Sequence, residues 1–139
     1  MSRRWMTRIS LAAVLALAAV SCGGGDDGGN EVTLDDYSIS TASSTASPGA
    51  VTFDLTNDAG QIHEFVVVKT DLAADALPLD ETGDVDENGD GIEPVDEVED
   101  IAAGALAHLT VDLAAGTYVL LCNLPGHYRQ GMHASFTVS

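Results

Sequence analysis

The sequence predicts an all-β fold, a sandwich of short strands, and three observations support this class. Apolar residues alternate with polar residues in several short segments, as they do in half-buried strands. Turn signals separate those segments, which is typical of β-sandwiches. About a hundred residues remain after a leader and a Gly/Asp-rich linker, which is enough for one domain with a single core.

Four segments show the alternation most clearly, and each is expected to bury one face. Their inward-facing residues are Val51, Phe53 and Leu55; Leu109, Val111 and Leu113; Tyr118, Leu120 and Cys122; and Ala134, Phe136 and Val138. Turns are expected at residues 47–49, before the first segment, and at residues 114–116, between the second and third. The chain contains no visible internal repeat.

Residues 71–100 are expected to form an acidic insertion between strands, with helical or irregular structure. Eleven residues from Asp80 to Asp100 are Asp or Glu, so the insertion is expected to contribute little core. Residues 86–97 match the calcium-loop pattern D-x-[DN]-x-[DN]-G-x5-E. Pro94 and Glu93 depart from that pattern and no amphipathic helices flank it, so a solvated acidic loop is the preferred interpretation and calcium binding the alternative.

The first 21 residues have the features of an export signal and are excluded from the fold. Arg3, Arg4 and Arg8 precede an apolar stretch over residues 9–20. That stretch is shorter than a membrane span requires. The paired arginines also resemble a twin-arginine export signal, which leaves two export routes open.

Cys22 closes this leader. Small residues precede it and glycines follow it, which resembles a bacterial lipobox, where the Cys would be lipidated and would begin the mature chain. The alternative is an ordinary signal peptide with an incidental Cys. The expected organisation is therefore a signal peptide over residues 1–21, a linker over residues 22–30 after lipidated Cys22, and one domain over residues 31–139.

The charge of the remaining chain is strongly negative. Lys69 and Arg129 are the only basic residues outside the leader, against 22 acidic residues. This balance excludes nucleic acid as a partner, because the phosphate backbone would be repelled.

The loop after the third strand segment contains Cys122, His127 and Met132 within eleven residues. Soft sulfur ligands select copper, and one Cys with two His and a weak axial Met is the ligand set of blue copper centres. A second His must then come from elsewhere. His63 is the natural candidate, because it follows a turn and opens an apolar segment, while His133 is a weak substitute.

Cys122 has no evident disulfide partner if Cys22 carries lipid, and an unpaired thiol in an oxidising compartment needs a reason. Metal ligation supplies one, because a coordinated thiol is deprotonated. The alternative is a disulfide between Cys22 and Cys122, which would join a glycine-rich tail to a loop beside His127.

These residues make the sequence similar to the cupredoxin family, of the plastocyanin and azurin type. The resemblance implies a Greek-key β-sandwich with an acidic insertion that holds one mononuclear type 1 copper at one end. It implies His63, Cys122 and His127 as strong ligands and Met132 as the weak axial ligand. Glu64 stands where those relatives commonly carry an Asn that ties the two ligand segments together.

The resemblance implies an extracytoplasmic copper protein that carries single electrons between redox partners and is not an enzyme. A metal whose positions are filled by protein ligands has no open position for a substrate. The alternative is a copper-handling protein without redox turnover. Copper delivery is expected to use exposed Met-rich or His-rich motifs, and two of the three Met residues lie in the leader.

Location and partners follow from the leader and the charge. The export signal and lipidated Cys22 predict a protein held by lipid at the outer face of the cytoplasmic membrane, in the periplasm or at the cell surface. The negative surface predicts redox partner proteins that present a basic docking patch, because opposite charges steer association.

Overall fold

The computed structural model describes residues 29–139. The expected export signal and the Cys22 lipidation site lie outside the described residues. Within residues 29–139, no helix is long and apolar enough to cross a membrane.

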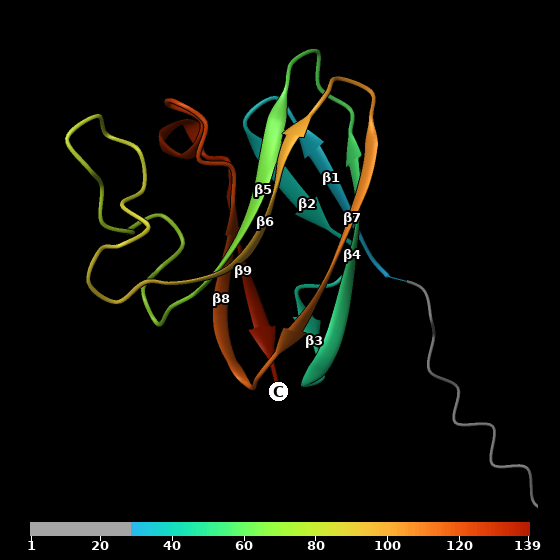
Figure 1. Ribbon diagram of the computed structural model, residues 1–139, viewed down its shortest axis with the longest axis vertical. Helices are drawn as coiled ribbons and strands as arrows, with labels where there is room; N and C mark the ends of the chain where they lie inside the picture. The colour runs from blue at the N-terminus through green and yellow to red at the C-terminus, as the bar shows by residue number, and fades with distance from the viewer. Residues whose placement is uncertain (1–28) are drawn as a thin grey trace, which may run out of the picture.

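Two mixed β-sheets pack face to face and confirm the predicted all-β sandwich (Figure 1). The four-stranded sheet has the order β2-β1-β4-β7 and the five-stranded sheet the order β3-β9-β8-β5-β6. The elements are β1 (Asn30–Asp35), β2 (Ser38–Thr41), β3 (Thr45–Ala46), β4 (Gly49–Asn57), β5 (His63–Lys69), β6 (Glu93–Ile101), β7 (Leu106–Leu113), β8 (Gly116–Leu121), the 3-10 helix η1 (Tyr128–Gln130) and β9 (His133–Val138). Two pairs, β1 with β4 and β3 with β9, are parallel, and the other pairs are antiparallel.

The core between the sheets is made by the residues that the alternation predicted. Eleven of the twelve predicted inward-facing side chains are buried and Ala134 is partly buried against them. Phe53 on β4 lies 5.2 Å from the ring of Phe65 on β5 and 5.3 Å from that of Phe136 on β9, measured between centroids. These aromatic contacts join the two sheets at their centre.

Residues 71–100 differ from the expectation of helical or irregular structure, because their second part is strand β6. β6 pairs antiparallel with β5, and two register shifts interrupt the pairing. Its acidic residues are exposed while Val95, Val98 and Ile101 turn toward the core. The register shifts space these inward residues three apart instead of two, so no regular alternation marks the strand.

The first part of the insertion builds a second core, so the expectation that it would contribute little core was wrong. Leu77 and Val85 are buried with Tyr128. They cover the outer face of the five-stranded sheet, where the buried residues are Val66 and Val68 of β5 and Val119 and Leu121 of β8. A few apolar residues of the insertion suffice for this, because they are buried against an apolar sheet face. β5 is consequently buried on both faces.

Asn57, at the end of β4, fixes the turn that leads into β5. Its side chain is fully buried. The Nδ2 group donates to the carbonyl oxygens of Gln61 at 2.9 Å and Ile101 at 2.8 Å, and Oδ1 accepts from the backbone N–H of Ala59 at 3.0 Å. One amide therefore bonds three backbone groups, two in the turn and one at the end of β6.

Replacing Asn57 by Ala should lower the free energy of unfolding by about 3 kcal/mol, because the three hydrogen bonds are lost and their backbone partners stay buried. Urea unfolding of the two proteins measures the difference. Asp58→Asn, at an exposed position in the same turn, should change stability by less than about 0.5 kcal/mol. Equal stability of Asn57→Ala and the control would contradict this role.

Candidate metal centre

The four predicted ligands lie at the ends of three adjacent strands or in the loop between two of them, at one end of the sandwich. His63 is the first residue of β5, Cys122 directly follows β8, and Met132 directly precedes β9. β8 pairs with β5 on one side and with β9 on the other. The loop that joins β8 to β9, which we call the ligand loop (residues 122–132), therefore starts beside His63, and it carries His127 back to the same end.

The donor atoms of three of these residues converge. His63 Nδ1 and His127 Nδ1 lie 3.2 Å apart. Cys122 Sγ lies 3.4 Å from His127 Nδ1 and 3.8 Å from His63 Nδ1. A point equidistant from three atoms so placed is about 2.0 Å from each, which is a typical metal–nitrogen bond and slightly shorter than a metal–thiolate bond. The spacing of this soft donor set fits a transition metal ion.

Burial differs among the ligands. His63, Cys122 and Met132 are fully buried, whereas His127 keeps an exposed part. His63 Nε2 is the one buried side-chain nitrogen or oxygen in residues 29–139 without a hydrogen-bond partner. The other ring nitrogen, Nδ1, is the one that meets the other donors. The ring of His127 also contacts Tyr37 edge-on, with 5.2 Å between the centroids.

Burial also decides the protonation of these groups. It lowers the pKa of His63, and the nearby His127 lowers that pKa further. Burial raises the pKa of the Cys122 thiol, although the backbone N–H of Glu64 opposes part of the shift. Both shifts favour the uncharged side chains. Metal binding here must therefore displace the thiol proton, so the affinity for a metal rises with pH.

The ligand loop closes on itself through backbone contacts. The N–H of Met132 donates to the carbonyl of His127 at 3.2 Å, and the N–H of Cys122 donates to the carbonyl of Met132 at 3.1 Å. Gly126 and Gly131 have φ values of 79° and 110°, in the left-handed region that favours glycine. These two glycines let the loop turn before His127 and end η1 before Met132.

Glu64 ties the two ligand segments together. Its Oε1 accepts from the backbone N–H of Asn123 at 2.8 Å. Glu64 follows His63 and Asn123 follows Cys122, so this hydrogen bond joins the neighbours of two ligands. Burial raises the pKa of the Glu64 carboxyl, and the hydrogen bond from Asn123 partly opposes that shift. Glu64 thus makes a connection of the kind for which plastocyanin and azurin commonly use Asn.

The acidic insertion lies beside the ligand loop, which the sequence did not indicate (Figure 1). The side chain of Asn123 exchanges two hydrogen bonds with the backbone of Val85, and Asp84 Oδ1 accepts from the N–H of Gly126 at 2.8 Å. Asn123 and Tyr128 are site residues that sequence reasoning missed. Most of their partners are backbone groups, which no sequence motif marks.

The calcium alternative receives no support from residues 29–139. The three converging ligands are the only group of His, Cys, Asp or Glu side chains there that is close enough to hold a metal ion. The carboxylates of residues 86–97 do not gather into such a group. His133 also lies outside it, with its ring 5.0 Å from that of Tyr128.

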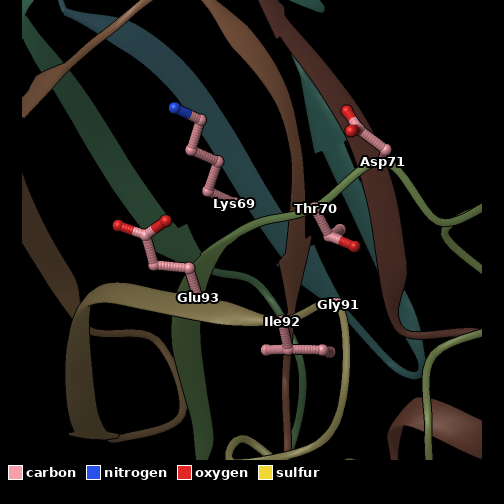
Figure 2. A pocket seen from close by; sticks show the side chains of 6 residues that line it. All are labelled: Lys69, Thr70, Asp71, Gly91, Ile92 and Glu93. Carbon is pink, nitrogen blue, oxygen red and sulfur yellow. The ribbon is translucent and has the colours of Figure 1, made fainter.

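A shallow hollow of about 330 Å³ lies at the far end of β5 from the ligands (Figure 2). It is lined by Lys69, Thr70, Asp71, Gly91, Ile92 and Glu93. Figure 2 shows Lys69 and Glu93 on one side of the hollow and Asp71 on the other. β5 begins at His63 and ends at Lys69, so the hollow is about 20 Å from the metal centre along the strand.

Solved structures similar to this one include three auracyanins. Dithionite-reduced auracyanin from the photosynthetic bacterium Roseiflexus castenholzii superposes with a TM-score of 0.59 at 24% identity, over 78% of this chain and 94% of that chain. Auracyanin B gives a TM-score of 0.53 at 26% identity, over 78% and 86%. Auracyanin A, a blue copper protein from the green thermophilic bacterium Chloroflexus aurantiacus, gives 0.52 at 24% identity, over 78% and 99%.

A comparison with curated protein sequences gives no match. The family model of the sulfocyanin (SoxE) domain matches residues 42–139, which is more than half of the chain and contains all four predicted ligands. The sandwich fold, the convergence of His63, Cys122 and His127, and the buried Met132 agree with that match. The chain therefore belongs to the sulfocyanin domain family, and it is a cupredoxin whose ligands have the arrangement of a type 1 copper site.

Proposed function

We propose that the protein carries single electrons between redox partners outside the cytoplasm. The observation that carries this proposal is the convergence of two imidazole nitrogens and one thiolate sulfur within 3.8 Å of one another. Bound copper would supply the one-electron chemistry by alternating between Cu(I) and Cu(II). The protein would hold the donors in place in both states, because the strands and the closed ligand loop fix them.

The same geometry supports a carrier over an enzyme or a copper-delivery protein. Side chains of the protein would supply all four ligands, so no position on the metal would be left for a substrate. Delivery requires ligands that can exchange with a partner, whereas His63, Cys122 and Met132 are fully buried. A copper-handling role without redox turnover is therefore the weaker alternative.

Electrons would enter and leave through His127, the one ligand with an exposed part. Pro125 is exposed in the ligand loop, and Ile62, which precedes His63, is 45% exposed. These apolar groups would form a docking surface close to the ligands from which a bound partner would exclude water. Tyr37, whose ring contacts His127, would belong to the same surface.

Copper(II) added to the domain should produce an intense visible band, because thiolate-to-copper charge transfer accompanies this ligand set. Cys122→Ser should abolish the band, as absorption spectroscopy would show. Met132→Leu is the matched control: it removes only the weak axial contact, so the band should remain while the reduction potential rises. A Ser variant with an unchanged band would sink the assignment of Cys122.

We further propose that the redox partner presents a basic patch and that nucleic acid is not a partner. Two basic residues oppose 22 acidic ones outside the leader. Glu97 and Glu99 are exposed on β6, whose last residue, Ile101, pairs with His63. Negative charge therefore lies near the metal end, where it would steer a cationic partner.

Electron transfer from hexaammineruthenium(II), a cationic donor, should slow as ionic strength rises, because salt screens the attraction. Replacing Glu97 and Glu99 by Gln should flatten this dependence in stopped-flow measurements. Replacing Glu93 and Asp112, which are exposed at the opposite end, by Gln and Asn changes the net charge equally but should flatten it less. Equal slopes for the two variants would remove the β6 acids from the steering.

The location is also a proposal: the protein is exported and held by lipid on Cys22 at the outer face of the cytoplasmic membrane, in the periplasm or at the cell surface. The lipobox-like sequence around Cys22 supports it. The full chain expressed in a bacterium should partition with membranes and carry lipid, by mass spectrometry of the mature protein. Cys22→Ala should abolish lipidation and membrane retention. A wholly soluble wild-type protein without lipid would reject the anchor.

A further inference from the structure

We propose that residues 74–87 of the acidic insertion act as a brace. This brace holds the ligand loop in the conformation that binds the metal. Asn123 and Tyr128 are the positioning residues through which it acts. The inference rests on the proposed copper function and deepens it, because it assigns a role at the metal centre to a segment that supplies no ligand.

Asn123 forms the central joint of the brace. Its Oδ1 accepts from the N–H of Val85 at 2.8 Å, and its Nδ2 donates to the carbonyl of Val85 at 3.0 Å. Nδ2 also donates to Glu87 Oε1 at 2.9 Å. The side-chain amide thus pairs with Val85 as a neighbouring strand would. The backbone N–H of Asn123 is held from the other side by Glu64.

Two more joints lie farther along the ligand loop. The N–H of Gly126 donates to Asp84 Oδ1 at 2.8 Å. The hydroxyl of Tyr128, a buried residue, accepts from the N–H of Leu77 at 3.0 Å and donates to the carbonyl of Ala74 at 2.7 Å. Apart from the bond between Asn123 and Glu87, each of these hydrogen bonds uses a backbone group of one partner, so the backbone paths of both segments fix the geometry.

The joints stand next to the ligands themselves. Asn123 directly follows Cys122, and Gly126 and Tyr128 flank His127 on both sides. Both strong ligands of the loop therefore have a neighbour attached to the insertion. Displacement of the insertion would change the direction in which these two side chains leave the backbone.

The brace is anchored to the five-stranded sheet by buried apolar side chains, which a solvated acidic loop would lack. Leu77 and Val85 are 5% and 3% exposed and pack on the outer face of β5 and β8, together with Tyr128. β5 also begins with His63, so the same sheet carries a ligand and supports the brace on its outer face. The ligand loop is therefore held by the sheet and by the brace that packs on it.

Support from the brace matters because the ligand loop is long and must be ordered to bind a metal. Eleven residues with two left-handed glycines have many conformations available without the metal, and ordering them on metal binding would weaken affinity. A loop ordered in advance also moves little between oxidation states. The alternative is that the loop holds its form through its own backbone hydrogen bonds, and that the insertion only covers it.

The test begins with the metal-free protein. Asn123→Ala should accelerate hydrogen exchange of the His127 and Met132 amides about tenfold, because the loop opens more often once its joint is lost. These two amides bond within the loop, to Leu124 and His127, so they report its order and not the deleted contacts. Asn88→Ala, at an exposed position of the insertion, is the matched control and should leave their exchange unchanged.

Tyr128→Phe provides an independent test if Asn123→Ala fails to fold. It removes one hydroxyl while retaining the ring in the second core, and it should accelerate the same amides. Asn123→Asp retains the acceptor for the Val85 N–H, but it sets a carboxylate oxygen against the Val85 carbonyl and the Glu87 carboxylate, so it should accelerate exchange at least as much as Asn123→Ala. Wild-type exchange in folded Asn123→Ala or in Tyr128→Phe would overturn the brace.

The copper-loaded protein gives a second readout. Asn123→Ala should lose copper to a chelator about tenfold faster than wild type and shift the midpoint potential, because neighbours of the ligands tune a metal site. Asn88→Ala should change neither. If wild type forms no blue centre, the proposed function fails, while amide exchange still tests the brace. If wild type is blue and Asn123→Ala matches it in copper loss and potential, the brace alone is wrong.

Discussion

The antiparallel pairing of β5 with β8 is the constraint on which the rest of the structure depends. It brings the first residue of one strand, His63, beside the residue that ends the other, Cys122. It also creates a strip of sheet that is buried on both sides, by the main core on one face and by Leu77 and Val85 on the other. A strand enclosed in this way resists local opening, so the ligands it carries are held with little freedom.

The chemistry of the centre depends on the identity of its ligands and on the rigidity with which the strands hold them. Burial favours the neutral forms of Cys122 and His63, so a bound metal ion would have to displace the thiol proton to gain a thiolate ligand. The ligands would all come from the protein, and His127 is the one that is partly exposed to solvent. A centre built in this way favours outer-sphere exchange of an electron over binding and release of a substrate.

The sequence predicted the sandwich and the ligands because both leave local signals. Phe53 and Phe136 lie in alternating segments, and Cys122, His127 and Met132 share one short loop. The sequence did not predict β6 because its register shifts break the alternation. It did not predict the second core because Leu77 lies in an apolar stretch without regular spacing and Val85 lies between two acidic residues. The contacts of Asn123 could not be predicted for another reason. Most of them join its side chain to the backbone of a segment about forty residues away, and no local sequence pattern indicates such a contact.

β6 has a further consequence, which concerns association between copies of the molecule. It is the outer strand of its sheet, so one row of its backbone groups is open to pairing with another chain. Exposed carboxylates along most of its length repel an identical strand, and Pro94 removes one donor near its start. The acidic edge thus discourages growth of the sheet from one molecule into the next.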